Sequence, residues 1–414
     1  MDRTVLTLSF LLAAVQLPGQ DLSRMAYNRY VGSSTYTFPA TEPGQLVMEN
    51  VRGDIVITGV STGDVEITET VSVRASSEEK AARLYDEVKA SVKQVSGEGE
   101  ALAVVIAGKS SRGWHASLDY SIRVPTLFSL KVNSRGGDVE VDKVKGQIDL
   151  ITGGGDMDLS HLTGRVTAST SGGDMDGYEL SGRVFLNTAG GDIDVESVQG
   201  DLTVRTSGGD IRVENVHGGV SVTTAGGDID LMDIEGREIV GRTGGGDIAA
   251  AGITGRVDLS TSGGNISTEN ISGDLDASTS GGDIEMENTM GDAQVWTSAG
   301  AIVGKEMLGA VNAQTSAGDI VIIKVWDSGL DEHDIDLKTS AGDIELTLPG
   351  NFSARFWARV LSPYEKPGES IVTDFPLTIT ASEAIARAKG TLNDGVYSVR
   401  LESAVGTITI FREE

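Results

Sequence analysis

Residues 188–228 read TAGGDIDVESVQGDLTVRTSGGDIRVENVHGGVSVTTAGGD. A glycine pair followed by aspartate recurs within it with a constant 18-residue period, at Asp192, Asp210 and Asp228. The same period runs from Asp138 to Asp319, with one 19-residue step and with asparagine or alanine at two of the positions. A fixed period of this length indicates one structural unit stacked on itself many times. The period predicts an architecture and carries no information about activity.

Each unit contains two short runs in which apolar and polar residues alternate. Apolar side chains recur one and three places after the aspartate, as at Ile193 and Val195. A threonine recurs four places before the next aspartate, as at Thr206, and the alternation predicts that it faces inward. Alternation with a period of two is typical of β-strands with one buried face, and glycine accepts the backbone angles of a tight corner. Neither strand can bury its apolar face alone, so we expect successive coils to pair in parallel. The sequence therefore predicts an all-β fold, a parallel β-solenoid (β-helix) with 18-residue coils.

The segments that flank the repeats break the period. Residues 1–20 combine Arg3, an apolar stretch from Val5 to Val15 and Pro18-Gly19, a pattern that predicts a secretory signal peptide. Beyond it we expect a linker over residues 21–43, a small α/β cap over 44–134 with one helix at about 77–95, the solenoid over 135–348, and C-terminal coils with a cap over 349–414.

The expected N-terminal cap contains two stretches that resemble half coils, Val51–Ile57 and Gly63–Ile67. An amphipathic helix follows, for which Ser76 or Ser77 is the expected N-cap. A helix laid on strands would close the open end of a stack, whose unpaired edge would otherwise recruit other chains.

Composition and charge narrow the range of partners. The net charge of −28 argues against nucleic acid, because phosphate binding needs basic patches, and it favours a soluble, monomeric protein. The absence of cysteine excludes disulfides, thiolate nucleophiles and cysteine-ligated zinc. A membrane-spanning helix needs about 20 consecutive apolar residues. No such run follows the expected signal peptide, which predicts no transmembrane span.

A set of motifs spans roughly residue 44 to the C-terminus: Gly53–Ile57, the helix after Ser76, Tyr120–Pro125, the Ser-Gly-Gly-Asp-Ile coils and the closing Gly406–Ile410. In these motifs the chain resembles the bacterial "putative adhesin" family, which carries a domain of unknown function related to the head-GIN domain. The resemblance implies an exported β-solenoid, and no established catalytic motif comes with it.

The recurring aspartates are the first candidate for chemistry. In-register stacking would place their carboxylates about 5 Å apart, where neighbours repel by about 1 kcal/mol in water. Acceptance of backbone N–H bonds at the corner would offset that repulsion, and so would a row of calcium ions, for which Asp156, Asp174, Asp192, Asp210 and Asp228 are the candidate ligands. The single glycine-paired corner per coil, and the replacements Asn265 and Ala301, favour turn capping and predict no metal and no cofactor.

The remaining polar residues predict no catalytic site. Acidic pairs such as Asp156 with Asp158 and Asp174 with Asp176 point outward on one strand face, but they repeat without a singular partner residue, as a solvated face would. The four histidines show no metal-ligand spacing.

We therefore expect an exported, non-enzymatic solenoid, in the periplasm, on the cell surface or secreted, with a structural or adhesive role at the cell envelope. An envelope protein or a surface glycan is the expected partner. Two alternatives remain open: an accessory of envelope stress or signalling that binds other proteins, and an enzyme that acts on polysaccharides.

Overall fold

The structure is a computed structural model and describes residues 22–40, 43–61, 63–95, 103–109, 116–326, 333–361, 369–382 and 384–413. The expected signal peptide at residues 1–20 lies outside the described residues. The chain divides into two compact units, Met1–Thr206 and Ser207–Glu414.

The first unit is built from strands and one helix. Its elements are β1 (Ser23–Ala26), β2 (Arg29–Pro39), β3 (Gly44–Val51), β4 (Ile55–Val60), β5 (Asp64–Arg74), α1 (Glu78–Val88), β6 (Ser91–Val95), β7 (Ala103–Ala107), β8 (Ala116–Pro125), β9 (Phe128–Ser134), β10 (Val139–Asp142), β11 (Lys145–Ile151), β12 (Met157–Ser160), β13 (Thr163–Ser169), β14 (Met175–Asn187), β15 (Ile193–Gln199) and β16 (Leu202–Arg205).

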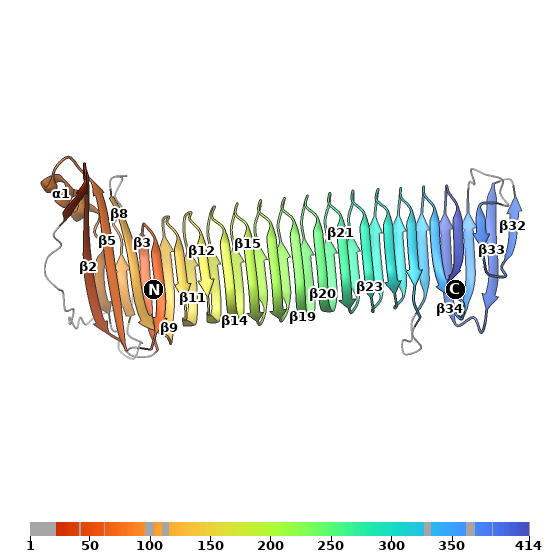
Figure 1. Cartoon of the computed structure of the whole chain (residues 1–414), viewed down its shortest axis with the longest axis horizontal. Helices are drawn as coiled ribbons and strands as arrows, with labels where there is room; N and C mark the ends of the chain where they lie inside the picture. Colours follow the sequence, from red (N-terminus) through yellow and green to blue (C-terminus); the bar gives the residue numbers. More distant parts are fainter. Residues whose placement is uncertain are drawn as a thin grey trace, which may run out of the picture. The chain divides into compact units, whose positions relative to one another are not determined.

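The coils of the first unit stack in parallel and in register, as the period predicts. Val139 pairs with Met157, Met157 with Met175, and Met175 with Ile193, each one period further along the chain. These four side chains are at most 1 % exposed and form one column of the interior. Figure 1 shows the coils from β9 to β15 as repeated pairs of strands. The prediction of a parallel β-solenoid is confirmed.

The threonines form a second interior column. Thr152, Thr170, Thr188 and Thr206 are at most 6 % exposed. Each Oγ1 donates to the carbonyl of a glycine in the preceding coil, at 2.9 Å in the bond from Thr188 to Gly173. The hydroxyl therefore ties each coil to the corner of the coil before it, and the inward orientation expected from the alternation is confirmed.

Strands β3 and β4 form part of the first coils. They come early in the sequence, but in the sheet each lies between two strands that come later in the sequence. Strand β4 pairs in parallel with both β8 and β10, and β3 pairs in parallel with both β7 and β9. The half coil predicted at Val51–Ile57 is thus part of the stack. The expected division of cap from solenoid at residue 135 is wrong, because β3 and β4 are coil strands that lie inside the range assigned to the cap.

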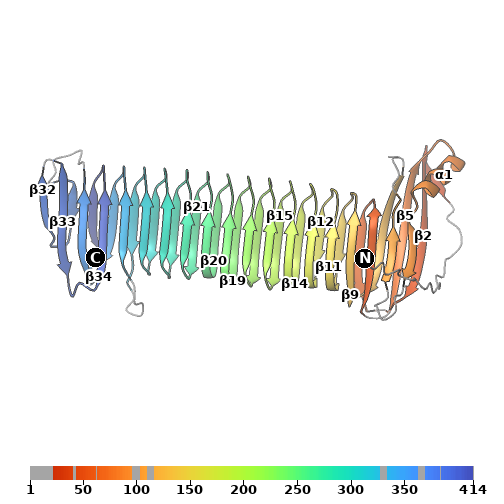
Figure 2. The ribbon, with the colours of Figure 1, turned by 180° about the vertical axis from the view of Figure 1, so that it is seen from behind.

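The true cap is an antiparallel sheet with a helix. Strand β2 pairs antiparallel with β5 from Arg29 opposite Arg74 to Pro39 opposite Asp64, and β5 pairs antiparallel with β8. Figure 1 shows β2, β5 and β8 side by side with α1 near them, and Figure 2 shows β2, β5 and α1 from behind. The linker expected at residues 21–43 is therefore wrong: Tyr30 and Phe38 are buried in β2, although polar residues separate them.

The helix is shorter than expected. Ser77 accepts from the backbone N–H of Lys80 and caps α1 as predicted, but the helix ends at Val88. Residues 91–95 form β6, which pairs antiparallel with β7. The apolar residues after Val88 therefore belong to a strand. The helix expected at 77–95 is wrong beyond Val88. The half coil expected at Gly63–Ile67 belongs to β5 and is antiparallel, so that expectation is wrong too.

The second unit consists of strands. They are β17 (Ile211–His217), β18 (Val220–Thr223), β19 (Ile229–Arg242), β20 (Ile248–Ser260), β21 (Ile266–Ser272), β22 (Leu275–Ser278), β23 (Ile284–Thr289), β24 (Ala293–Thr297), β25 (Ile302–Met307), β26 (Val311–Thr315), β27 (Ile320–Lys324), β28 (Ile335–Thr339), β29 (Ile344–Pro349), β30 (Ala354–Val360), β31 (Ile371–Thr373), β32 (Thr378–Ser382), β33 (Ile385–Leu392), β34 (Tyr397–Ser403) and β35 (Ile408–Glu413).

The coils of the second unit stack in the same way, and the chain end lies inside the stack. Ile211 pairs with Ile229, which pairs with Ile248 across the longer step. Strand β34 pairs in parallel with β28 and with β30, and β35 does so with β29 and β31. C-terminal coils therefore exist within residues 349–414, as expected, but the coil that contains the closing Gly406–Ile410 lies between segments that precede it in the sequence.

Candidate functional site

The corner aspartates are bonded to the backbone, and their bonds run between coils. Oδ1 of Asp156 accepts from the backbone N–H of Asp174 at 3.0 Å, and Oδ1 of Asp174 accepts from Asp192 at 2.9 Å. In the second unit Asp210 accepts from Asp228 at 2.8 Å, and Asp228 from Asp247 at 2.7 Å. The expected role in capping the corner is thus present, but the N–H belongs to the next coil and not to the same turn.

Most of the residues named as candidate calcium ligands take part in these bonds. Asp156, Asp174, Asp210 and Asp228 each use one carboxylate oxygen to accept a backbone N–H bond from the next coil. No group of three or more histidine or acidic side chains that could hold a metal ion occurs among the described residues. The neutral residues fit the same scheme, since Asn265 accepts from Asp283 at 2.9 Å.

A second aspartate column lies half a coil after the first in part of the second unit, and sequence reasoning missed it. Asp274 accepts from the backbone N–H of Asp292 at 3.2 Å, and Asp292 accepts from Ala310 at 2.8 Å. Asp334 accepts from Ser398 at 2.8 Å. The signal was the aspartate that follows the lone glycine of the coil, at Gly273-Asp274 and Gly291-Asp292.

The outward acids of the first unit form an in-register row, here called the acidic ladder: Glu140, Asp158, Asp176 and Asp194. Their strands align Glu140 with Asp158, Asp158 with Asp176, and Asp176 with Asp194. All four side chains are exposed, as the alternation predicts. Paired residues on neighbouring parallel strands lie about 4.8 Å apart, so the ladder concentrates negative charge on one face.

A groove of about 250 Å³ runs over the ladder, and its lining includes Asp158, Asp176, Asp194, Tyr178 and Glu196. Partial burial, together with the charges of Asp158 and Asp194, raises the pKa of Asp176 above its ordinary value. The carboxylates therefore repel one another, and a cationic group in the groove would relieve that repulsion.

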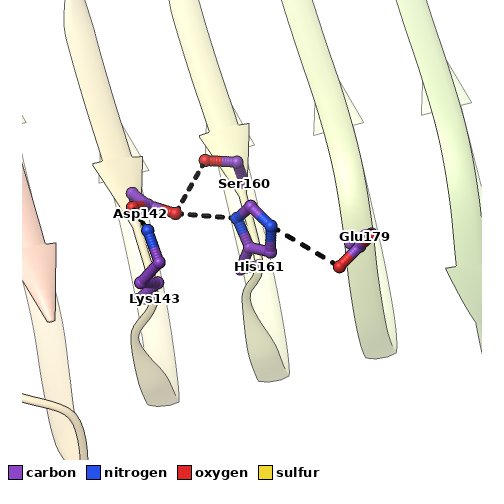
Figure 3. A network of polar contacts seen from close by, with 5 residues as sticks. All are labelled: Asp142, Lys143, Ser160, His161 and Glu179. Carbon is purple, nitrogen blue, oxygen red and sulfur yellow. Dashed lines mark hydrogen bonds and ion pairs between the residues drawn. The ribbon is translucent and has the colours of Figure 1, made fainter.

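A polar network adjoins the ladder at the next bend of the coil (Figure 3). Nδ1 of His161 lies 2.8 Å from Oδ1 of Asp142, and Nε2 lies 3.5 Å from Oε2 of Glu179. Ser160 Oγ donates to the same Asp142 oxygen at 3.1 Å. Burial works to raise the pKa of Asp142, but hydrogen bonds from Lys143, His161 and Ser160 hold that pKa below its ordinary value.

This network is not arranged as a hydrolytic triad. A serine nucleophile needs its hydroxyl bonded to the histidine, with the carboxylate on the far side of the imidazole. Here Ser160 and His161 both bond Asp142, so the histidine is not placed to take the serine proton. The arrangement instead links three successive coils through Asp142, His161 and Glu179.

The bend recurs in both units as a left-handed residue, which the sequence pattern did not reveal. The residue five places after the corner aspartate has a positive φ, 52° at His161 and 51° at Glu179. The other non-glycine members are Lys143, Ser197, Asn215, Asp233, Asn270, Asn288 and Glu306. Asparagine tolerates this conformation best among them, and the recurrence of asparagine at this position was the available signal.

No helix among the residues that the structure describes is long and apolar enough to span a membrane.

Part of the chain matches the model of a known protein family. Residues 196–347 match the family model described as Toastrack DUF4097. No curated protein matches the chain significantly.

Three solved structures resemble the chain weakly. A "putative cell adhesion protein" from Clostridium sporogenes is 9 % identical, covers 92 % of this chain and 99 % of its own, and has a TM-score of 0.18. A "putative adhesin" from Bacteroides fragilis is 16 % identical, and the match covers 71 % of this chain and 97 % of the adhesin, with a TM-score of 0.23. A "putative lipid binding protein" from Parabacteroides distasonis is 12 % identical, with 76 % and 96 % covered and a TM-score of 0.18. Likeness at this level does not bear on function. The comparison that bears on the repeats is the family model, and residues 196–347 are similar to the Toastrack DUF4097 family.

Proposed function

We propose that the protein is an exported, non-enzymatic β-solenoid with a structural or adhesive role at the cell envelope. We further propose that the acidic ladder is its binding surface and that it takes basic groups of an envelope protein. The observation that carries the proposal is the in-register row Glu140, Asp158, Asp176 and Asp194 on an exposed strand face.

The spacing of the ladder suits repeated contacts better than a single reaction. Like charges about 5 Å apart repel by about 1 kcal/mol in water, and each bound cation removes part of that cost. Several weak contacts on a rigid row add up through high effective concentration, so a partner with a run of lysines or arginines gains affinity without a deep pocket. A catalytic site, in contrast, needs singular residues in defined roles.

The ladder is tested by co-sedimentation of the purified full chain with isolated bacterial cell envelopes. The triple variant Asp158→Asn, Asp176→Asn and Asp194→Asn keeps the size of each side chain and removes three charges. We expect it to lose most of the binding, and we expect added salt to weaken the binding of the unmodified protein.

A matched control removes three charges elsewhere in the same unit. Asp64, Glu79 and Glu87 are exposed and lie on the cap strand β5 and the helix α1. Their exchange for asparagine or glutamine should leave binding intact. Equal loss in both variants would show a general effect of net charge and would remove the ladder from the proposal.

Export is tested separately by fractionating cells that express the full chain or a chain without residues 2–20. We expect the full chain outside the cytoplasm and the shortened chain within it. The full chain in the cytoplasm would contradict the proposal of an envelope role.

A further inference from the structure

Four arginines gather at one cavity in the cap region of the first unit, although the whole chain carries a net charge of −28. The cavity has a volume of about 600 Å³, and its lining includes Arg29, Arg52, Arg74 and Arg135. All four side chains are exposed. They come from β2, from the corner after β3, from β5 and from the corner after β9.

The arginines are arranged as two like-charged pairs in register. Arg29 lies directly opposite Arg74 in the antiparallel pairing of β2 with β5. Val51 is paired with Ser134, so Arg52 and Arg135 occupy equivalent places one residue further on. Like charges directly opposite each other on neighbouring strands destabilise a sheet. The Arg29–Arg74 pair therefore carries a cost that a bound anion would relieve.

Two of these arginines are oriented by hydrogen bonds to neutral oxygens. Nε of Arg29 donates to Ser72 Oγ at 2.9 Å, and a terminal nitrogen of Arg135 donates to Oδ1 of Asn50 at 3.4 Å. Because Ser72 is uncharged, its bond positions the guanidinium group of Arg29 without neutralising it. An arginine fork held in this way loses less freedom when it binds an anion.

Two acids of the neighbouring corners, Asp119 and Asp54, accept backbone hydrogen bonds. Oδ1 of Asp119 accepts from the N–H of Asp54 at 3.3 Å, and Oδ1 of Asp54 accepts from the N–H of Asp138 at 3.1 Å. Burial raises the pKa of Asp119, and the charge of Arg29 works against that rise. These carboxylates thus cap the backbone at the corners of successive coils.

Small residues leave space between the guanidinium groups. Ser72, Ala116 and Ser117 line the cavity with Gly53, Gly136 and Gly137. A side chain at Gly53 or Gly137 would collide with backbone atoms, since an added Cβ would lie 2.1 Å from the Leu118 carbonyl oxygen and 2.3 Å from that of Gly53, respectively. The volume lies in the range of small-molecule sites, and the two serine hydroxyls add neutral hydrogen-bonding groups.

We propose that this cavity is a binding site for a tetrahedral oxyanion, a phosphate or sulfate group, carried by a small molecule or by a lipid headgroup. Guanidinium groups present rigid forks of N–H donors that match such oxygens, and several arginines can share a group that carries more than one negative charge. The site goes beyond the proposed envelope role and is independent of the acidic ladder.

The test measures binding to the full chain by calorimetry and by the shift in melting temperature. The probes are inorganic phosphate, glucose 6-phosphate, and vesicles made of equal parts phosphatidylcholine and phosphatidylglycerol. Glucose and pure phosphatidylcholine vesicles are the neutral controls, and chloride keeps the ionic strength constant. Saturation by the two soluble phosphates indicates a small-molecule ligand, and binding to the phosphatidylglycerol vesicles alone indicates a lipid headgroup.

The test variant is Arg29→Gln with Arg74→Gln, which removes one like-charged pair. We expect its affinity for the bound probe to fall by about tenfold or more, and its melting temperature without anion to be no lower than that of the unmodified chain. If this variant does not fold, Arg52→Gln with Arg135→Gln removes the other pair.

The matched control is Arg165→Gln with Arg183→Gln, which removes two exposed arginines that are also paired in register in the same unit. We expect it to retain binding. The proposal is overturned if the control loses as much affinity as the test variant, or if none of the three anionic probes binds the unmodified chain.

Discussion

The backbone N–H of Ala301 donates to Oδ1 of Asp283 at 2.7 Å, across one full coil. The aspartate column is therefore directional, because the carboxylate of one coil binds the N–H group of the next. A coil can lack its own aspartate and still have its corner capped by the preceding coil. The missing carboxylate instead affects the following coil. Ile302 pairs with Ile320, so Ala301 lies beside Asp319 but has no side-chain oxygen to accept the backbone N–H of Asp319.

Restoring the missing acceptor should stabilise the second unit. We expect Ala301→Asp to raise the free energy of unfolding by about 1 kcal/mol, the net value of a typical hydrogen bond, reduced by repulsion from Asp283 and Asp319. Ala301→Asn supplies an uncharged acceptor and should stabilise as well, whereas Ala301→Leu adds bulk without an acceptor. Thermal unfolding of the three variants measures the effect, and a melting temperature for Ala301→Leu as high as for Ala301→Asn would show that the acceptor is irrelevant.

Divalent cations should add little to stability. The corner carboxylates already accept backbone N–H bonds, as Asp156 does from Asp174, and a calcium site needs six to eight oxygens. We expect the same melting temperature in chelator and in excess calcium. A ligand bound only to the folded state would raise it in proportion to RT ln(1 + [L]/Kd), so a large drop on chelation would restore the calcium candidates.

Lys324 should make the second unit more stable at alkaline pH. Its side chain is fully buried, and Nζ donates to the carbonyl groups of Leu308 and Gly309. Burial lowers the pKa of Lys324 from 10.5 to about 7, with the charge of Asp292 opposing the shift. Between these two values the unfolded chain binds more protons than the folded one, so stability rises with pH through this window and is lowest below it.

The variant Lys324→Met tests this assignment. Lys324 is paired with Met307 of the neighbouring coil, so methionine fits the same column. We expect the rise in melting temperature across the window to disappear in the variant. Lys305→Met, a change at an exposed lysine of β25, is the control and should keep the rise. An unchanged pH profile in Lys324→Met would contradict the lowered pKa.

Glu69 should have the opposite effect in the cap. It is fully buried on β5 and accepts a hydrogen bond from the Tyr85 hydroxyl on α1 at 3.0 Å. Burial raises the pKa of Glu69 above 4.5, although the bond from Tyr85 works to lower it. The folded chain thus keeps its proton at pH values where the unfolded chain has lost it, and stability declines as pH rises from 4.5 through the folded-state pKa.

Replacing the carboxyl by an amide removes this titration. We expect Glu69→Gln to flatten the decline and to stabilise the cap above the folded-state pKa, because the amide oxygen still accepts from Tyr85 and no charge is buried. Amide hydrogen exchange in β5 measures the local stability. Glu87→Gln, at an exposed position of α1, should leave the decline in place, and a Glu69→Gln variant that keeps it would assign the titration to another group.

The coil was predictable from the sequence alone because its information is local and repeated. The spacing from Asp192 to Asp210 set the coil length, and the alternation around Ile193 and Val195 set which side chains face inward. The inward threonines, such as Thr188, followed from the same parity. In the candidate site, parity also predicted the outward direction of Asp158 and Asp176, but not the bend at which His161 meets Asp142, because a left-handed residue leaves no alternation to detect.

Only the tertiary structure decided which strands are neighbours. Alternation indicates that a strand has one buried face, but it does not identify the neighbouring strand or its direction. Val51–Ile57 and Gly63–Ile67 therefore have similar sequence patterns. The first joins the parallel coils, whereas the second lies in the antiparallel cap. The insertion of residues 44–60 and 397–413 between other segments depends in the same way on contacts between distant parts of the chain. The pairing of Arg29 with Arg74 does so too, because the two residues face each other only once β2 and β5 have found their register.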